Sequence, residues 1–600
     1  MNITLNFSDY AVMIAYLTAL VVIGIVTAGR QNDTKNFLLG GGKMPWFALG
    51  ISCLMAALSA FSLVMIPGEI FNHGLNFFIF GLITPLFTLV TCKIFMRFYF
   101  KLGSFTPFEY LEYRYDGSVR SLIAGLTIYL RLIYLGMVLF STSKVFEGAA
   151  GWSPWFSIPL VGFIALVFTS SGGLKAVVWT DVMQFIVLIG GLFCILGFLF
   201  YNINGGVIEG ITCPFRNGHG LDEFAKLEFY TLNPYARLSI WLLLLGAFMS
   251  PITTMASDQM TIQRLLASGS YEKAQKTQLI NTMLTIPTLI ILWVIGLCVF
   301  TYFHQNPDLK PASGDTALFN FISMRLPSPL PGLVLAGMLA AVISTLNAVF
   351  NSMATVYCKE FHIRYFKKNL DEPGQVKVSR IATVTIGLLA IALGLLVSTS
   401  AEILRQSVVE ASTVFNAFDA IVIPAFLFAV LSKRASTVLV WVTAGVVWGV
   451  KLAMITWFFA SQYVMKTFTV GSDPSWAGPQ GIGLIIWPLA VTLLMWIIWA
   501  IYKYRNPDKR YMILLTLASS AAGALVGAVI WYIVSNTLLA QGEGKALSFI
   551  WVALPSIVSY AVLGTIWLLT GPVPPKEKYQ GLTLFDAGEV IQNNSEQSNN

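Results

Sequence analysis

Long, nearly uninterrupted apolar blocks dominate the chain, and short alternating patterns are rare. A bilayer core takes about 20 apolar residues in helical form. On that measure we count about fifteen candidate spans: 8–29, 46–70, 76–98, 121–148, 154–171, 178–201, 236–257, 275–302, 328–357, 379–399, 407–432, 437–460, 481–503, 512–535 and 547–570. The pattern predicts an all-α polytopic membrane protein, placed in the cell membrane with the lipid bilayer as its main partner.

The loops between these blocks differ in their basic charge. Cytoplasmic loops of membrane proteins collect Lys and Arg. With the N-terminus outside, 26 of the 37 basic residues fall in inner loops and 8 in outer loops. We therefore predict an outside N-terminus and an inside C-terminus. The net charge of +8 then reflects topology, and we expect no nucleic acid as a partner.

Composition agrees with this interpretation. Charged residues make up 11% of the chain and apolar residues 56%, whereas a typical globular protein has about 25% charged residues. Several soluble domains, a secreted disulfide scaffold and a disordered chain are excluded. The sequence contains no HExxH, GxSxG or CxxC motif, and its four histidines are scattered. We therefore expect a protein that is not an enzyme and has no catalytic residues.

Two of the spans carry helix breakers. Span 46–70 has a centre of small residues, Ala56–Ala60, and Pro67-Gly68 is expected to end its helix early; span 236–257 contains Pro251. Irregular backbone at membrane depth is tolerated only where it is buried in protein or lines a cavity. Two interrupted spans in matching positions of two repeats point to a transporter binding site. The alternative is that each proline only kinks a packed helix.

The ninth span, 328–357, places the adjacent hydroxyls of Ser344 and Thr345 in an otherwise apolar helix. Two hydroxyls together with carbonyls freed by a broken helix would form the oxygen cage that a dehydrated Na⁺ requires. The alternative is hydrogen bonding between helices, which Ser and Thr commonly provide. Residue types and spacing alone leave both interpretations open.

Five segments resemble the sodium:solute symporter family, in the same order. They are FLLGG at 37–41 before Pro45-Trp46, TPFEYLEYRY at 106–115, SGGLKAVVWTDVMQ at 171–184, SDQMTIQR at 257–264 and LAAVISTLNAVFNSMAT at 339–355. The resemblance covers roughly residues 8–435. It implies sodium-coupled import of a small solute by alternating access, with Na⁺ as the co-transported ion.

The resemblance also implies an inverted five-plus-five helix repeat with a leucine-transporter-like core and extra flanking helices. The expected organisation is an extra helix and cytoplasmic loop (1–45), a first repeat (46–201), an extracellular loop (202–235), a second repeat (236–432), additional C-terminal helices (433–570) and a disordered cytoplasmic tail (571–600).

By the same resemblance, the sodium ligands are the side chains of Ser344 and Thr345 with the backbone carbonyls of Ala341, Met55 and Leu58. Asp181 matches a family aspartate implicated in sodium passage and, in some members, in a second sodium. The member with a second sodium has a Ser where Ala341 stands, so the number of ions stays open.

The solute is less clearly indicated. The candidate lining consists of Ser59, Phe61, Ser62, Thr254 and Asn416. By the resemblance, Ser59 and Ser62 are compatible with a Ser and a Thr of the sialic-acid type, and Asn416 aligns near a substrate glutamine of sugar members. Thr254 stands near the place of a gating Tyr of the galactose type, which argues against a hexose. Arg131, within a span, is a candidate anchor for a carboxylate, since Arg pairs with carboxylates in a bidentate manner. Its alternative role is snorkelling, or pairing with Glu147 or Glu410. We expect an organic anion, such as a carboxylate or acidic sugar, as cargo. A neutral sugar, polyol or amino acid is the alternative, and a sensor or channel on the same scaffold is an alternative of another class.

Overall fold

The computed structural model describes residues 6–28, 34–58, 60–230, 240–311, 314–367, 370–404, 422–447, 565, 571–580 and 582–583. All regular elements among them are helical, which confirms the all-α prediction. By length and composition, six of these helices could cross a membrane: Phe78–Leu102, Gly117–Glu147, Gly173–Asn202, Tyr271–Gln305, Leu330–Phe366 and Glu372–Thr399. The count of fifteen spans and the orientation stay predictions, since 481–503, 512–535 and nearly all of 547–570 lie outside the described residues.

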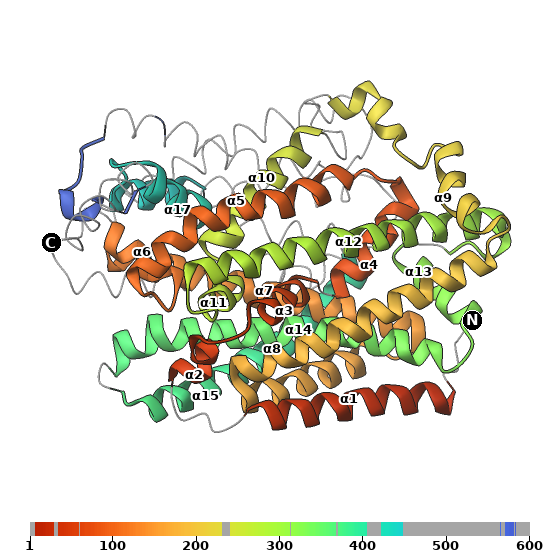
Figure 1. Cartoon of the computed structure of the whole chain (residues 1–600), viewed down its shortest axis with the longest axis horizontal. Helices are drawn as coiled ribbons and strands as arrows, with labels where there is room; N and C mark the ends of the chain where they lie inside the picture. Colours follow the sequence, from red (N-terminus) through yellow and green to blue (C-terminus); the bar gives the residue numbers. More distant parts are fainter. Residues whose placement is uncertain are drawn as a thin grey trace, which may run out of the picture. The chain divides into compact units, whose positions relative to one another are not determined.

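The chain divides into two compact units, the first made of 1–107, 127–232 and 238–398 and the second of 108–126, 233–237 and 399–600. The helices of the first unit are α1 (Phe7–Ala28), α2 (Thr34–Leu39), α3 (Trp46–Ala57), α4 (Ala60–His73), α5 (Phe78–Leu102), α8 (Pro154–Asn202), α9 (Gly206–Arg216), α10 (Ile240–Ala256), α11 (Gln259–Leu266), α12 (Tyr271–Gln305), α13 (Gly314–Arg325) and α14 (Leu330–Val356) (Figure 1). The helices α7 (Gly117–Ala150) and α15 (Glu372–Leu404) belong partly to each unit.

Helix α14 forms the core of the first unit. Nearly all of its residues are buried, and it packs between α8 and α3, with α1 also against it (Figure 1). Small residues allow this close packing: a Cβ on Gly337 would lie 3.3 Å from the Cα of Leu188 on α8. The π-helical turn Tyr357–Phe366 continues α14. Ser344 and Thr345 are thereby held at the centre of the unit.

Helix α1 is fastened to the start of α14 by one buried carboxylate. Asp9 accepts the backbone N–H of Asn6 with one oxygen and the backbone N–H of Gly332 with the other, both at 3.0 Å. A Cβ on Gly332 would come within 2.4 Å of the Asp9 carbonyl oxygen, so glycine is needed for this approach. The first turns of both helices therefore receive an acceptor that their own backbone cannot supply.

Both breaks predicted from the sequence occur, but not at the prolines. Leu58 is extended between α3 and α4 (φ −88°, ψ 94°), within the small-residue centre. Pro67 lies inside α4, which continues to His73, so the expected early end is wrong. Pro251 likewise lies inside α10, and the interruption comes later, at Asp258. The helix continues past Pro251 to Ala256, and the carbonyl of Pro251 itself accepts the Thr91 hydroxyl of α5 at 3.3 Å.

A third irregularity divides α8. Gly173 has φ 58° and ψ −173°, a backbone conformation that is essentially restricted to glycine. It separates the apolar helix Pro154–Val167 from the apolar helix Gly173–Asn202. These two helices correspond in position to the predicted spans 154–171 and 178–201. The bend precedes Asp181 by about two helical turns.

The second unit contains α6 (Pro107–Arg114), α17 (Val422–Leu431) and an ordered part of the C-terminal tail. Residues 571–580 and 582–583 are described, and Leu582 and Thr583 are buried. The Tyr110 hydroxyl donates to the Leu582 carbonyl at 2.7 Å. The disorder expected for 571–600 stays a prediction, and the described residues within this range include buried side chains and a hydrogen bond to α6.

Candidate functional site

A buried carboxylate joins three helices at the centre of the first unit. Asp181, on α8, is fully shielded from solvent. One of its oxygens accepts the Ser344 hydroxyl of α14 at 2.5 Å, and the other accepts the Ser52 hydroxyl of α3. Asp181 therefore links the helix that precedes the Leu58 break with the helix that carries the predicted sodium ligands.

Arg264, on α11, completes this cluster. Its Nε donates to the Ser52 hydroxyl oxygen at 2.7 Å, its Nη1 donates to the Met260 carbonyl at 2.9 Å, and its Nη2 lies 3.4 Å from the Asp181 carboxylate. Every residue of α11 is buried. A buried ion pair is tolerated when hydrogen bonds satisfy its remaining polar atoms, and both partners here meet that condition.

The predicted sodium ligands lie around the end of α3. The Thr345 hydroxyl donates to the Ala56 carbonyl at 3.3 Å, and the Leu58 N–H donates to Leu54 at 2.8 Å. Carbonyls in the last turn of a helix lack intrahelical donors, which frees oxygens at this end of α3. Met55, Leu58 and Ala341 are all buried. The two hydroxyls use their protons as donors, so their oxygen lone pairs are left for a cation.

This donor set suits a hard monovalent ion. Among the described residues, no group of three or more His, Cys, Asp and Glu could hold a metal. The cluster instead offers hydroxyls, freed carbonyls and one carboxylate. The assignment of Met55, Leu58, Ala341, Ser344, Thr345 and Asp181 to sodium stays a prediction with this geometry behind it.

A line of buried polar groups continues from the cluster. The Thr169 hydroxyl donates to the Asn347 side-chain oxygen at 2.6 Å. Within the described part of the chain, the side-chain nitrogens of Asn347 and Asn351 are buried and have no hydrogen-bond partner. Such groups are usually satisfied by ordered water. The surroundings of the cluster are therefore suited to hydration.

The predicted solute residues are only partly described. Ser59 and Asn416 lie outside the described residues, and of Phe61 only the backbone is described. Ser62 is half-buried on α4. Thr254 donates its hydroxyl to the Ser250 carbonyl of its own helix at 2.9 Å. These five positions stay predictions.

Arg131 has a partner that the sequence did not indicate. It forms an ion pair at 2.7 Å with Asp258, at the α10–α11 break. Asp258 also caps α11 by accepting the Met260 N–H at 3.1 Å. Glu147, one of the alternative partners considered for Arg131, forms an ion pair with Lys144 at 2.8 Å; Glu410 lies outside the described residues. Arg131 thus pairs with the carboxylate of Asp258, the residue at the break between α10 and α11.

Sequence reasoning missed Ser52 and Arg264 as members of the site. Arg264 lies between the predicted spans 236–257 and 275–302, in a segment expected to be a cytoplasmic loop. In the structure it is almost completely buried. The signal was present in the segment SDQMTIQR, where Arg264 lies one to two turns after the interruption and on the same short helix as buried Gln263.

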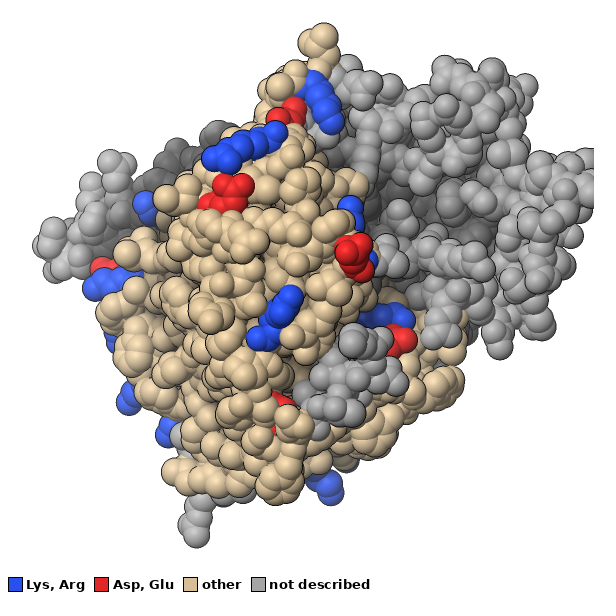
Figure 2. Space-filling model, turned by 90° about the vertical axis from the view of Figure 1, so that its right-hand side faces the viewer, with Lys and Arg blue, Asp and Glu red and all other residues tan. Residues whose placement is uncertain are grey.

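Charged side chains on one face of the molecule are dispersed. Figure 2 shows a face on which blue and red side chains are isolated and mixed among uncharged surface. No single-sign patch is visible on the coloured part of this face, so the carboxylate cluster described above is the more distinctive electrostatic feature.

The chain is similar to known sodium-coupled transporters. The profile of the sodium:solute symporter family matches residues 37–449. A sodium/sialic acid symporter of Proteus mirabilis is 27% identical over 405 residues, covering 66% of this chain and 80% of the relative. The sodium-coupled monocarboxylate transporter 1 of Homo sapiens is 26% identical over 416 residues, covering 66% of each chain.

Among solved structures, a substrate-bound, outward-open Na⁺-coupled sialic acid symporter aligns with a TM-score of 0.68 at 20% identity. The alignment covers 88% of this chain and 98% of that one. This likeness extends the agreement from sequence to fold. The family and these relatives are transporters and not enzymes, and their coupling ion is sodium. On the extent of the profile match, which spans well over half of its length, this chain belongs to the sodium:solute symporter family.

Proposed function

We propose that this sodium-coupled symporter imports a small organic anion by alternating access, in the cell membrane, with its N-terminus outside and its C-terminus inside. The observation that carries the proposal is that α14 contacts both the buried Asp181 through Ser344 and the broken end of α3 through Thr345, which donates to the Ala56 carbonyl. A sodium ion held by α14 and by the freed carbonyls of α3 would tie together elements of the two repeats.

Sodium binding would thereby favour one arrangement of the repeats over the other. A ligand shifts a conformational equilibrium only by its difference in affinity for the two states. A site shared between α3 and α14 provides that difference, since movement of either helix separates its ligands. The outward-open arrangement is the one we assign to the sodium-bound state.

The coupling energy is sufficient for accumulation. A tenfold sodium gradient contributes about 1.4 kcal/mol, and a membrane potential of roughly 100 mV contributes about 2.3 kcal/mol per charge. One sodium ion therefore supports an accumulation of a neutral solute on the order of several hundredfold. A monoanion that moves with one sodium ion loses the electrical part, so it needs a second ion to reach the same ratio.

The anionic cargo is supported by Arg131 and by the acids named for the two relatives. In the present arrangement Arg131 already holds Asp258. We propose that the carboxylate of the cargo competes with Asp258 for this guanidinium. A neutral sugar, polyol or amino acid is the second candidate. The ion pair of Arg131 with Asp258 favours it, because this guanidinium already has a carboxylate partner.

Uptake by proteoliposomes is the direct test. Purified protein is given labelled monocarboxylates, acidic sugars, neutral sugars and amino acids, with and without an inward sodium gradient. We expect sodium-dependent uptake of an acid, and expect Ser344→Ala and Thr345→Ala to raise the sodium concentration for half-maximal uptake at least tenfold. Thr383→Ala is the matched control, since Thr383 is buried and donates only within its own helix.

The remaining outcomes separate the alternatives. Sodium dependence that is unchanged in both hydroxyl variants would refute the ion site. Uptake restricted to neutral solutes would replace the anion by the second candidate. Solute flux that runs at full rate without sodium would indicate a channel.

A further inference from the structure

A cavity of about 470 Å³ lies between α5 and α12, and none of its lining residues belongs to the sodium cluster. Its lining consists of Leu89, Cys92, Lys93, Tyr271, Glu272, Gln275, Lys276, Gln278 and Leu279. The lining residues of α5 lie at and just after the middle of that helix, and those of α12 lie in its first turns. In the proposed orientation the first turns of α12 are at the cytoplasmic end.

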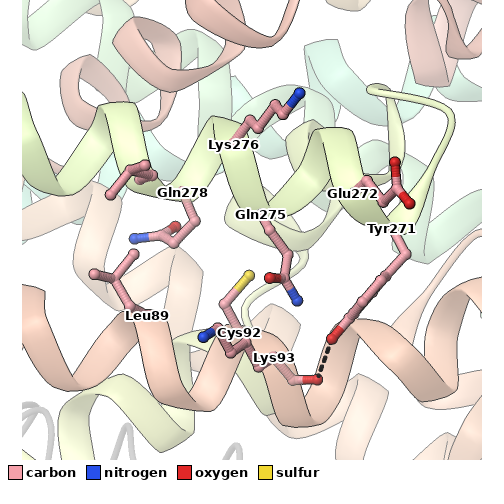
Figure 3. A pocket seen from close by; sticks show the side chains of 9 residues that line it. Leu89, Cys92, Lys93, Tyr271, Glu272, Gln275, Lys276 and Gln278 are labelled. Carbon is pink, nitrogen blue, oxygen red and sulfur yellow. Dashed lines mark hydrogen bonds between the residues drawn. The ribbon is translucent and has the colours of Figure 1, made fainter.

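Hydrogen-bonding groups of α12 are directed toward α5. Figure 3 shows Gln275 and Tyr271 extending from α12 to the α5 side, where Lys93 and Cys92 lie. The Tyr271 hydroxyl donates to the Lys93 carbonyl at 3.2 Å, which closes the cavity on one side. The cavity therefore presents an amide, a hydroxyl and an ammonium group to an occupant.

The charges at the cavity have no partner of their own within the described structure. Lys93 and Lys276 are exposed, and neither forms an ion pair with a described carboxylate. Glu272 is the one acidic side chain in the lining, and Figure 3 draws it, like Lys276, away from α5. The part of the cavity that faces α5 is therefore positive, with Lys93 as its charge.

The surface beside the cavity is apolar. Leu86 and Val90 on α5 and Leu279 and Met283 on α12 are large side chains with about half of their surface exposed. They continue from the cavity along both helices, in segments apolar enough to span a membrane. An occupant that is polar at one end and hydrocarbon at the other fits this combination.

We propose that this cavity binds the head group of an anionic phospholipid of the cytoplasmic leaflet. The phosphate would lie at Lys93 and the Gln275 amide, and an acyl chain would follow Leu86, Val90, Leu279 and Met283. Basic pockets between membrane helices on the cytoplasmic side are suited to anionic head groups. A soluble phosphate would use the same polar groups and leave the apolar side chains unused.

Native mass spectrometry of the full-length protein tests the proposal, with phosphatidylglycerol and phosphatidylcholine of equal chain length as probes. We expect tighter binding of phosphatidylglycerol, and expect Lys93→Gln to weaken it about fivefold, the effect of one basic side chain near an anionic lipid surface. Lys273→Gln is the matched control, an exposed lysine of α12 outside the lining. It should bind phosphatidylglycerol as the unaltered protein does.

Leu279→Asn separates the two sources of phosphate, because it removes an apolar contact of the acyl chain and adds no charge to the cavity. It should weaken the binding of phosphatidylglycerol and leave the binding of inorganic phosphate unchanged. In the unaltered protein, inorganic phosphate should fail to displace the lipid at millimolar concentration. Equal binding of both lipids, or an unchanged affinity in Lys93→Gln, would overturn the proposal. Displacement of the lipid by inorganic phosphate would assign the site to a soluble anion and overturn it as well.

Discussion

The Arg264 guanidinium lies 3.4 Å from the Asp181 carboxylate, and the two side chains are 2% and 0% exposed. Ser52 bridges them, accepting from Arg264 and donating to Asp181. This arrangement connects α11 with α8 through α3. Removal of Asp181, Ser52 or Arg264 would leave a buried polar or charged group without its partner in this cluster.

Asp181→Asn and Arg264→Gln should each destabilise the protein by about 3–5 kcal/mol, the cost of leaving one partner of a buried ion pair alone. The double variant should lose less than the sum, since the two residues act on one interaction. Thermal unfolding in nanodiscs measures both effects. Glu147→Gln is the control, because the Lys144–Glu147 pair is exposed. Additive losses would contradict the coupling.

Arg131→Gln should abolish sodium-driven uptake of an acidic solute and leave sodium binding intact, because it removes the carboxylate anchor. Asp258→Asn should lower the KM for the acid, since it frees the guanidinium while the amide oxygen still caps α11. Uptake kinetics measure both. An equal loss of acid uptake in Arg131→Gln and Asp258→Asn would show that the Arg131–Asp258 pair is only structural.

His219 is expected to make the outer loop sensitive to acid. Burial lowers the pKa of His219 from its ordinary value, and Lys310 lowers it further, while Asp222 and the Phe71 carbonyl oppose the shift. Its Nε2 lies 2.8 Å from that carbonyl, and the ring stacks on Phe300 at 4.1 Å.

Because its folded pKa is depressed, the stabilising contribution of neutral His219 is complete above about pH 6.5, the unfolded value. It should be lost as the pH falls toward the folded pKa. Thermal unfolding between pH 7.5 and 5 should show this loss in the unaltered protein and in His304→Gln, and a smaller loss in His219→Gln. The same pH dependence in all three would place the effect elsewhere.

Arg114 should be irreplaceable by lysine. Its Nε donates to the Ala429 carbonyl at 3.0 Å, its Nη1 to Ala435 at 3.1 Å and to Lys578 at 3.3 Å, and its Nη2 to Ser432. The single ammonium group of a lysine cannot donate to all four of these carbonyls. Arg114→Lys should therefore unfold at lower temperature and lose hydrogen-exchange protection in 571–583. Exposed Tyr113→Phe is the control on the same helix.

Apolar block length was sufficient to predict the helical class and most helix positions. The block 76–98 corresponds to Phe78–Leu102, and 275–302 to Tyr271–Gln305. These predictions succeed because burial in lipid leaves a helix as the main way to satisfy the backbone. Short elements of the loops, such as α6 and α11, were not predicted, because they depend on packing against distant segments.

The breaks show where local reasoning fails. Proline marks the correct helix at Pro251 but the wrong residue, because the helix continues past it to Ala256. At the interruption, Asp258 forms an ion pair with Arg131, which lies more than a hundred residues earlier. Similarly, Ser344 and Thr345 were identified from residue type and resemblance, whereas the contacts of Ser52 and Arg264 with Asp181 appear only in the tertiary structure.

Asp9 has a practical consequence for altering the chain. Its two oxygens serve two polypeptide segments that are more than 300 residues apart, Asn6 and Gly332. A truncation or an N-terminal fusion that disturbs this carboxylate would remove an acceptor from the first turn of α14 as well as from α1. The first helix, although outside the predicted repeats, is therefore a poor place to shorten the protein for expression, and damage there should also affect α14, the helix that carries the predicted sodium ligands.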